Sequence, residues 1–335
     1  MKAVVYRQAL PVTAAEALLD ATLPDPVAAG RDLLVRVHAV SVNPVDTKVR
    51  RNMAPAEGQA RVLGFDAAGV VEAVGAEVTL FKPGDRVFYA GALNRPGSNA
   101  ELQCVDERLV GRMPASLAFA QAAALPLTGI TAWELLFDRL GVTAEAEGAL
   151  LIVGAAGGVG SILTQLARQL TKLTVIGSAS RASTQAWVRE LGAHHVIDHR
   201  QPLAAELKRV GVGAVTHVAG LTHTEAHYAQ IVESLAPQGR LGLIDDLSAP
   251  LDVRLLKPKS LSLHWEMMFT RSMFETPDMG AQGALLNRIA GLVDAGRVRS
   301  TLGEHFGRID ADNLKRAHAA VESLTTQGKT VLEGF

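Results

Sequence analysis

Residues 149 to 265 alternate short strand-like runs with amphipathic helical patterns, and this alternation most restricts the folds open to the chain. The strand-like runs are ALLIV, LTVIG, HHVID, AVTHVAG, GRLGLI and SLSLHW. Helical patterns such as VGSILTQLARQL, STQAWVRELG and EAHYAQIVESLA separate most of them. Strands that alternate with helices predict an α/β fold with a doubly wound parallel sheet, the Rossmann arrangement.

The residues on either side of this region follow a different rhythm. Up to about residue 125 the chain offers Val-rich runs, among them KAVVY, LLVRVHAVSV and AAGVVEAVG, separated by turn-forming stretches such as KPGD. This part predicts a β-rich barrel or roll. The tail from about residue 266 has helical patterns but no strand–helix alternation. We therefore expect a Rossmann domain over 126–265, and a second domain made from 1–125 and 266–335.

The composition excludes several classes of function. Lys plus Arg (33) nearly balance Asp plus Glu (34), and no basic run indicates a nucleic-acid or membrane-surface partner. The single cysteine, Cys104, rules out an intramolecular disulfide and argues against a zinc site built from cysteines. The first residues lack the apolar core of a signal peptide, and no run of about 18 apolar residues indicates a membrane span. We expect a cytoplasmic protein.

A glycine-rich turn, GAAGGVGS, joins the first strand of the alternating region to a helix. In a G-x-G-x-x-G pattern, the position of Gly157 lets the backbone approach a pyrophosphate, and that of Gly160 lets the helix pack against the sheet. Such patterns also occur in ordinary tight turns, but here strand, turn and helix follow in the required order. The turn therefore predicts a dinucleotide site, whose phosphates would meet the N–H groups at the helix start. Its predicted cofactor-binding residues are Ala155, Ala156, Gly157, Gly158, Val159 and Gly160.

The end of the next predicted strand, VIGSASR, contains no acidic residue. An NAD site ordinarily has an Asp or Glu about 20 residues after the turn, to hold the ribose hydroxyls. Here Ser178, Ser180 and Arg181 occupy that region, and a cation at a helix N-terminus is unfavourable without an anionic partner. A 2′-phosphate would supply the anion, so the segment predicts NADPH. The alternative is a solvated arginine beside serines that only cap the helix.

Several motifs, taken together, resemble the medium-chain dehydrogenase/reductase superfamily, and within it the zinc-free quinone oxidoreductase-like branch. They are SVNPVDTKVR, VLGFDAAGVVEAVGAEVTLFKPGDRV, PLTGITAWELL, GAAGGVGS and the closing GKTVLEGF. The stretch SLHWEMMFTRSMF is similar to a subgroup labelled zinc-type alcohol dehydrogenase-like. The resemblance covers essentially the whole chain. It implies a GroES-like catalytic domain built from both chain ends around the Rossmann domain, an active site in the cleft between them, and a homodimer.

The resemblance also identifies where zinc-dependent relatives place their metal ligands, and this chain departs from that pattern. Asn43 stands in place of a Cys, Phe65 and Asp66 stand in place of a His–Glu pair, and the third position falls at Ala124. A catalytic zinc needs three good protein ligands and an open position. We therefore expect no metal. The histidines of HTEAH and HHVIDH are expected to lie on a surface helix and a strand rather than around a metal ion.

The remaining site residues follow from the resemblance. It places Asn43 and Thr128 near the nicotinamide, where Asn43 could donate its amide N–H and Thr128 could hold the carboxamide or ribose. The residue-based alternatives are a turn-former before a proline for Asn43 and a helix N-cap for Thr128. The resemblance puts other side chains around the ligands: Phe65 and Asp66 in the substrate pocket, Phe269 closing it, and His199 beside the adenine end of the cofactor.

Hydride transfer without a metal favours acceptors that delocalise the developing charge themselves. A quinone or an α,β-unsaturated carbonyl does so, because its anion can be met by hydrogen bonds and protonated by solvent. We expect an NADPH-dependent, zinc-independent oxidoreductase that acts on such a small molecule. Two alternatives remain open: an enoyl-CoA-type reductase of the same superfamily, and a non-catalytic NADPH-binding protein with a structural or regulatory role.

Overall fold

The computed structural model describes residues 1–335, which divide into two compact units. Unit 1 contains Met1–Ile130 and Phe269–Phe335, and unit 2 contains Thr131–Met268. The sequence placed these boundaries a few residues earlier, after 125 and after 265. The first shift has a local reason, since helix α3 (Pro126–Trp133) runs across the boundary and leaves no turn residue to mark it.

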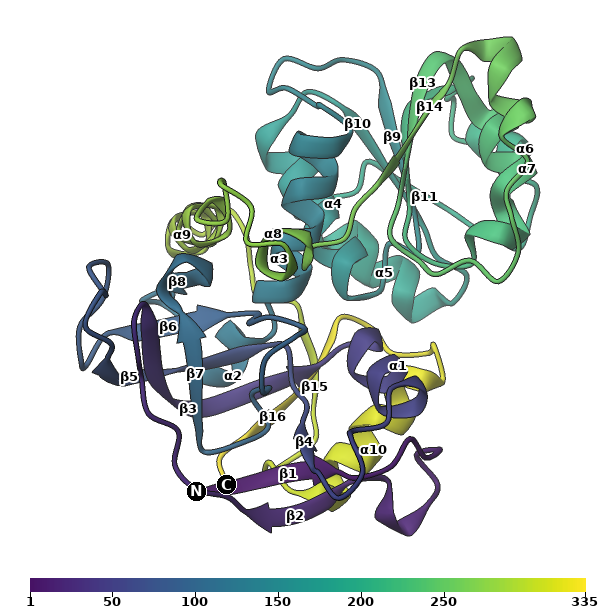
Figure 1. The fold of residues 1–335 in the computed structure, drawn as a ribbon. Helices are drawn as coiled ribbons and strands as arrows, with labels where there is room; N and C mark the ends of the chain where they lie inside the picture. Colours follow the sequence, from purple (N-terminus) through teal and green to yellow (C-terminus); the bar gives the residue numbers. More distant parts are fainter. The chain divides into compact units, whose positions relative to one another are not determined.

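Unit 2 is a six-stranded sheet in the order β11-β10-β9-β12-β13-β14, and every neighbouring pair is parallel. Figure 1 shows α4 and α5 on one face and α6 and α7 on the other. This is the predicted doubly wound fold. The strands are β9 (Ala149–Val153), β10 (Thr174–Ser178), β11 (His195–Ile197), β12 (Val215–Gly220), β13 (Leu235–Leu243) and β14 (Ser262–Trp265). The helices are η3 (a π-helix, Glu134–Arg139), α4 (Gly158–Leu170), α5 (Ala182–Glu190), α6 (Leu203–Arg209), α7 (Thr224–Ser234) and η4 (Val253–Lys259).

The core of unit 2 explains why its strands read as continuous apolar runs rather than as alternating ones. Helices cover both faces of the sheet, so all five residues of β9 are buried. Leu151, Ile176 and Val218, from three adjacent strands, belong to one buried cluster. The chain order reverses at β9, whose neighbours are β10 and β12. Ligands of such sheets bind at the carboxyl ends of the strands next to this reversal.

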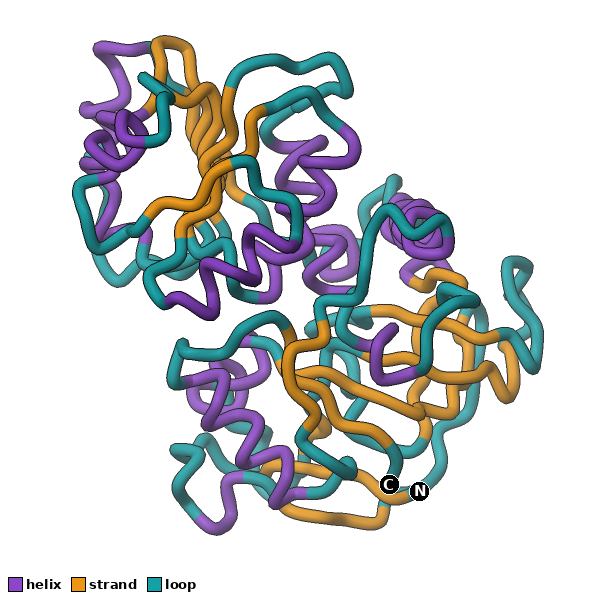
Figure 2. The backbone as a smooth tube through the Cα atoms, turned by 180° about the vertical axis from the view of Figure 1, so that it is seen from behind, coloured by secondary structure: helices purple, strands orange, loops and turns teal.

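Unit 1 is built from β strands of both chain ends. A seven-stranded sheet runs β15-β16-β3-β5-β6-β8 with β7 paired to β3, and a smaller sheet runs β2-β1-β4. The C-terminal β16 lies antiparallel to β3, with Thr330 opposite Val42. The two termini lie side by side in this unit (Figures 1 and 2). The strands are β1 (Lys2–Tyr6), β2 (Leu19–Thr22), β3 (Asp32–Val42), β4 (Arg61–Val62), β5 (Ala67–Val74), β6 (Arg86–Tyr89), β7 (Leu102–Asp106), β8 (Val110–Arg112), β15 (Leu302–His305) and β16 (Lys329–Glu333).

Helices complete unit 1. They are η1 (Ala15–Ala17), α1 (Pro44–Asn52), η2 (Glu107–Leu109), α2 (Phe119–Ala123), α8 (Thr270–Met273), α9 (Ala281–Asp294) and α10 (Ala311–Glu322). Helix α1 packs against α10, so residues from the start and the end of the chain meet here as well. Across both units, none of the helices has the length and apolar character needed to cross a membrane.

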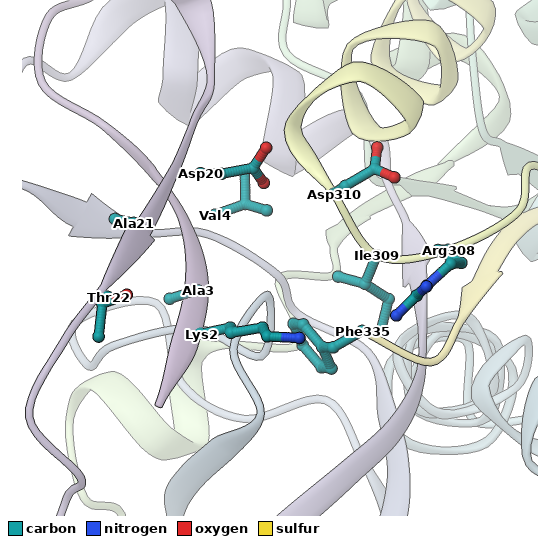
Figure 3. A pocket seen from close by; sticks show the side chains of 10 residues that line it. All are labelled: Lys2, Ala3, Val4, Asp20, Ala21, Thr22, Arg308, Ile309, Asp310 and Phe335. Carbon is teal, nitrogen blue, oxygen red and sulfur yellow. The ribbon is translucent and has the colours of Figure 1, made fainter.

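A polar cavity of about 450 Å³ lies in unit 1 between the β1–β2 hairpin and the turn before α10 (Figure 3). Two carboxylates line it, and both are engaged in holding the backbone. Asp20 accepts a hydrogen bond from the Ala311 N–H at 2.9 Å, and Asp310 accepts one from the Asn313 N–H at 2.7 Å. These contacts fix the start of α10, so the carboxylates serve the fold.

Candidate functional site

The glycine-rich turn lies at the carboxyl end of β9, where the order of the strands reverses. Gly154 has a φ of +87°, in the left-handed region that favours glycine. The turn closes through a hydrogen bond from the Gly157 N–H to the Gly154 carbonyl at 3.2 Å, and α4 begins at Gly158. The left-handed conformation that the tight turn requires is therefore adopted by Gly154.

The first N–H groups of α4 have no acceptor in the protein. Ser161 is the first residue of the helix whose N–H is bonded, to the carbonyl of Gly157 at 2.9 Å. The N-cap residue, Gly157, has no side chain that could accept a hydrogen bond, so the N–H groups of Gly158 and Val159 stay available. Both residues are partly exposed. Free N–H groups at the positive end of a 13-residue helix form a natural site for a phosphate.

The glycines at 157 and 160 serve different purposes. A Cβ at Gly160 would lie 2.4 Å from the Gly154 carbonyl oxygen and 2.6 Å from the Ala155 Cα, so no side chain fits there. A Cβ at Gly157 would lie 3.6 Å from its nearest neighbour, the same carbonyl oxygen, which is an ordinary contact. The protein itself therefore requires glycine at 160. At 157 glycine leaves open space beside the free N–H groups.

The three polar residues predicted to meet a 2′-phosphate lie at and just beyond the end of β10, and the structure separates their roles. Ser178 is buried, and its hydroxyl accepts a hydrogen bond from the Gly154 N–H at 3.1 Å. Ser178 thus stabilises the glycine turn. Ser180 is partly exposed. Arg181 is exposed and is the N-cap residue of α5, where its N–H binds the Thr184 hydroxyl at 3.3 Å.

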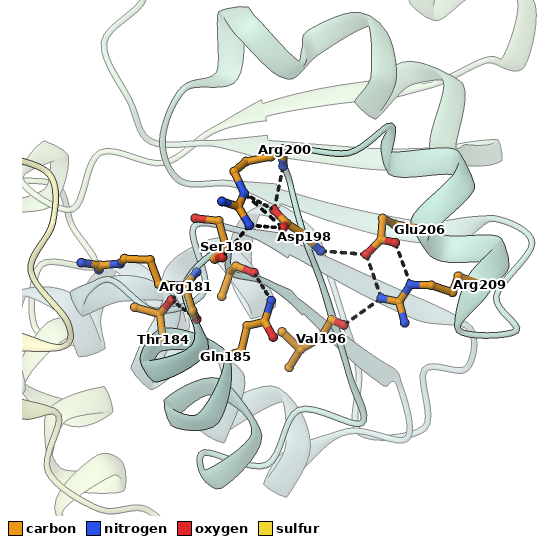
Figure 4. Close-up of polar contacts among 10 residues, drawn as sticks. Ser180, Arg181, Thr184, Gln185, Val196, Asp198, Arg200, Glu206 and Arg209 are labelled. Atoms are coloured by element: carbon orange, nitrogen blue, oxygen red, sulfur yellow. Dashed lines mark hydrogen bonds and ion pairs between the residues drawn. The ribbon is translucent and has the colours of Figure 1, made fainter.

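Arg200 is a second cation at this edge that the sequence analysis missed. It follows β11, the strand next to β10, and its Nη2 donates to the Ser180 carbonyl at 2.9 Å (Figure 4). Its Nε and Nη2 also donate to both oxygens of Asp198, at 2.6 to 3.1 Å. The arginine that ends HHVIDHR could have indicated a second cation. Only the strand order, however, places it beside the Ser178–Arg181 segment.

His199 lies between Asp198 and Arg200 in the chain, and its ring packs toward α7. Its ring centroid is 6.0 Å from that of His227, and burial lowers the pKa of His199 below the ordinary value, with His227 adding to the effect. The buried Nδ1 of His199 has no hydrogen-bond partner in the protein. No group of three or more His, Cys, Asp or Glu side chains in the chain is arranged to hold a metal ion.

Unit 1 brings Asn43 and Asp66 together in a buried polar cluster. Asn43 is 1% exposed and Asp66 is fully buried. The Asn43 side chain donates one N–H to Asp66 Oδ2 at 2.7 Å and the other to the Ser41 carbonyl at 3.5 Å. We expected this amide to donate to a bound ligand. In this structure its N–H groups face acceptors of the protein itself, and donation to a ligand stays a prediction.

Lys329 completes this cluster and was not predicted, although it belongs to the closing GKTVLEGF motif. Its Nζ donates to Asp66 Oδ2 at 3.0 Å and to the side-chain oxygen of Asn43, and Lys329 is 3% exposed. The Ser41 hydroxyl and the Leu127 N–H also donate to Asp66, at 2.7 and 2.8 Å. Four donors therefore surround the Asp66 carboxylate, and its place in the substrate pocket stays a prediction.

Asp46 stabilises the backbone on which the Asn43–Asp66 cluster is built. Its carboxylate accepts hydrogen bonds from the Asn43 N–H at 2.8 Å and from the Gly64 N–H at 3.0 Å, so it ties the start of α1 to the turn before Asp66. Complete burial raises the pKa of Asp46 to about 7, although the two N–H groups favour the ionised form.

The three other side chains that the resemblance placed around the ligands are also buried in unit 1. Phe65 and Phe269 meet edge to face, with ring centroids 5.3 Å apart, and are 1% and 2% exposed. Thr128 is 3% exposed, and its hydroxyl donates to the Leu125 carbonyl at 3.3 Å. Thr128 lies inside α3, which begins at Pro126, so it is not the N-cap of that helix.

The positions that correspond to zinc ligands do not fit a zinc ion. Asn43 directs its side-chain oxygen at the Lys329 ammonium, and Asp66 shares that ammonium. Phe65 and Ala124 carry no atom that could bind a metal. A cation is thus already present among these residues, as the charged end of a lysine. Zinc sites require several unoccupied N, O or S ligands, which this set does not supply.

A buried carboxyl pair joins two of the quoted motifs within unit 2. Glu134 of the WELL segment and Glu266 of HWEMMF are 1% and 4% exposed, and Arg139 Nε donates to Glu266 at 2.8 Å. Burial raises the pKa of Glu266 well above its ordinary value, and the adjacent Glu134 raises it further. Arg139 is the cation that pairs with Glu266 at this buried position.

Family models and curated relatives match this architecture. The model "Alcohol dehydrogenase GroES-like domain" matches residues 29–131, and the model "Zinc-binding dehydrogenase" matches residues 191–332. A zinc-type alcohol dehydrogenase-like protein from Staphylococcus aureus is 41% identical over 90% of both chains. A quinone oxidoreductase from Pseudomonas aeruginosa is 32% identical over 90% of this chain and 91% of its own.

Solved structures agree with these matches. A protein from Rhizobium etli, assigned by its description to the zinc-dependent alcohol dehydrogenases, has a TM-score of 0.96 and 58% identity over 100% of this chain and 98% of its own. The Escherichia coli quinone oxidoreductase, solved with NADPH, has a TM-score of 0.84 and 25% identity over 99% and 100%. The β-rich unit is thus the expected GroES-like domain, and the chain belongs to the medium-chain dehydrogenase/reductase superfamily, as an oxidoreductase related to the quinone oxidoreductases and the zinc-type alcohol dehydrogenase-like proteins.

Proposed function

We propose that this protein is an NADPH-dependent, zinc-independent reductase of quinones or α,β-unsaturated carbonyl compounds. The observation that carries the proposal is the carboxyl edge of unit 2. There the unpaired N–H groups of Gly158 and Val159 lie at the start of α4, and two arginines, Arg181 and Arg200, follow the next two strands. NADPH, when bound, supplies a hydride. The residues of this edge would hold its phosphates and leave no free carboxylate for an unphosphorylated ribose.

Zinc independence is supported by the Asn43–Asp66–Lys329 cluster. The lysine ammonium already satisfies both side chains, so a metal ion would have to displace a buried charge. Without a Lewis acid, the acceptor must spread the developing negative charge over its own conjugated system, as quinones and enones do. The relatives named as quinone oxidoreductases have the same fold and fit this acceptor class.

Steady-state oxidation of NADPH and NADH with a panel of quinones, enones and enoyl-CoA thioesters tests the proposal. We expect turnover with quinones or enones, and a preference for NADPH. Turnover with enoyl-CoA substrates alone would favour an enoyl reductase. Tight NADPH binding without turnover on any acceptor would favour a non-catalytic cofactor-binding protein.

The metal is tested separately. We expect elemental analysis of the purified protein to find far less than one zinc per chain, and we expect reductase activity to survive treatment with a chelator. One tightly held zinc per chain, with activity lost on chelation and restored by zinc, would contradict the zinc-independent mechanism.

A further inference from the structure

The Arg200 guanidinium is fixed in orientation although the side chain is exposed. Asp198 receives two hydrogen bonds from Nε, at 3.0 and 3.1 Å, and one from Nη2, at 2.6 Å. Nη2 also donates to the Ser180 carbonyl at 2.9 Å, and the Arg200 backbone N–H binds Asp198 at 3.0 Å. A long side chain is normally free to rotate in solvent. These contacts remove most of that freedom before any ligand binds.

The same contacts leave one end of the guanidinium unused. A guanidinium has five N–H groups in a planar fork. Those of Nε and Nη2 point to Asp198 and Ser180, whereas Nη1 has no partner in the protein. The two N–H groups of Nη1 belong to a cation whose orientation is fixed. They can therefore donate charge-assisted hydrogen bonds to a phosphate.

The strand register explains why this end of Arg200 lies at the cofactor edge. Ser178 of β10 is opposite Ile197 of β11, and the Ala179 N–H binds the Ile197 carbonyl at 2.9 Å. The carboxyl ends of the two parallel strands therefore finish together. The segment after β11 returns Arg200 to Ser180, one residue before Arg181 (Figure 4).

We propose that Arg200 is a second specificity-determining residue for the 2′-phosphate of the cofactor, with Asp198 as the residue that positions it. The proposal rests on the NADPH dependence proposed above. It also explains how an acidic residue can lie at this edge without selecting NADH. Asp198 is already occupied by the Arg200 side chain and backbone, so it cannot accept hydrogen bonds from ribose hydroxyls as well.

Calorimetric titration with 2′,5′-ADP and with 5′-AMP tests the proposal without any need for turnover. The two ligands differ only in the 2′-phosphate. In Arg200→Met we expect the affinity for 2′,5′-ADP to fall about ten-fold, the size expected for loss of a charge-assisted contact, and the affinity for 5′-AMP to stay unchanged. Arg200→Lys keeps the charge but cannot keep the fork, so an intermediate affinity is expected.

Arg209→Met is the matched control. Arg209 is another exposed arginine of the same unit, paired with Glu206 (Figure 4). We expect its variant to bind both ligands as the unmodified protein does. Thermal unfolding of each variant checks that a changed affinity does not come from a changed fold.

The possible failures are distinguishable. If the unmodified protein binds 2′,5′-ADP no better than 5′-AMP, the proposed NADPH preference itself is wrong, and the role of Arg200 falls with it. If the unmodified protein strongly prefers 2′,5′-ADP and Arg200→Met keeps the same preference, the role of Arg200 is overturned and the NADPH preference stands.

Discussion

The two polar regions of this protein differ in what their hydrogen-bonding groups face. In unit 1 the side chains of Asn43, Asp66 and Lys329 satisfy one another in a buried cluster. At the carboxyl edge of unit 2, the N–H groups of Gly158 and Val159 have no partner in the protein. Buried polar groups are almost always paired, so unpaired groups at a partly exposed edge are the ones that a ligand can use.

This difference separates residues that hold the fold from residues that bind a ligand. The unit 1 cluster occupies the positions where zinc-dependent relatives have metal ligands, yet it is closed. At the unit 2 edge, by contrast, the N–H groups of Gly158 and Val159 are unpaired hydrogen-bond donors. We therefore propose that unit 2 recognises the anionic cofactor and that Asn43 and Asp66 support the structure of unit 1.

The largest expected effect comes from breaking the closed cluster. Lys329→Met would leave Asp66 buried with no cationic partner, and such a loss typically costs about 3–5 kcal/mol of the free energy of unfolding. Denaturant unfolding measures it. The control Lys315→Met removes a surface pair with the exposed Asp312 and should cost less than about 1 kcal/mol. A Lys329→Met protein as stable as the control would show that the cluster does not hold the fold.

The next effect concerns the open edge. In Arg181→Ala we expect the affinity for NADPH to fall roughly ten- to a hundred-fold, because a charge-assisted contact to the 2′-phosphate is lost. The affinity for NADH should hardly change. Fluorescence titration measures both. Arg189→Ala, at the other end of α5, is the control and should bind both cofactors normally. Equal losses for NADPH and NADH would mean that Arg181 does not recognise the 2′-phosphate.

Within unit 2, the two glycines of the turn allow the same distinction between holding the fold and binding the cofactor to be tested. Gly160→Ala forces a Cβ into backbone atoms at 2.4 and 2.6 Å, and we expect it to cost about 1–3 kcal/mol of stability. Gly157→Ala fits the protein, so its stability should be close to normal. Its Cβ would nevertheless crowd an approaching pyrophosphate, and the affinity for NADPH should fall about ten-fold. Unfolding and cofactor titration of both variants should therefore give opposite patterns; a Gly157→Ala protein with normal affinity would contradict this role.

The smallest effect is a dependence of stability on pH. The pKa of Glu266 is raised in the folded protein above its ordinary value of 4.5, so above that pH the unfolded chain releases a proton that the folded one keeps. The contribution of Glu266 to stability is therefore present at low pH and is lost as the pH rises toward the raised pKa.

Glu266→Gln removes this dependence, because glutamine does not titrate. Between pH 5 and 8 the melting temperature of the variant should decline less than that of the unmodified protein. Glu233→Gln, an exposed glutamate of α7, should follow the unmodified protein. Parallel curves for Glu266→Gln and the unmodified protein would rule out a protonated Glu266.

Features that neighbouring residues encode could be predicted from the sequence alone. The alternation of apolar runs and helices indicated the doubly wound sheet, because each element is specified by its own periodicity. The GAAGGVGS turn could be located because strand, turn and helix follow within a few residues. Comparison with the family pattern was enough to predict that Asn43 and Phe65 are not zinc ligands.

Which side chains meet depends on the packing of whole elements, and the sequence does not reveal it. Lys329 reaches Asn43 across 286 positions because β16 pairs with β3 in one particular register, with Thr330 opposite Val42. Arg200 reaches Ser180 because β11 and β10 are adjacent and end together. Local periodicity carries no information about strand order or register, which depend on how whole elements pack. For that reason the sequence could name Asn43 as a ligand-binding residue, and only the fold shows its amide already bound to Asp66.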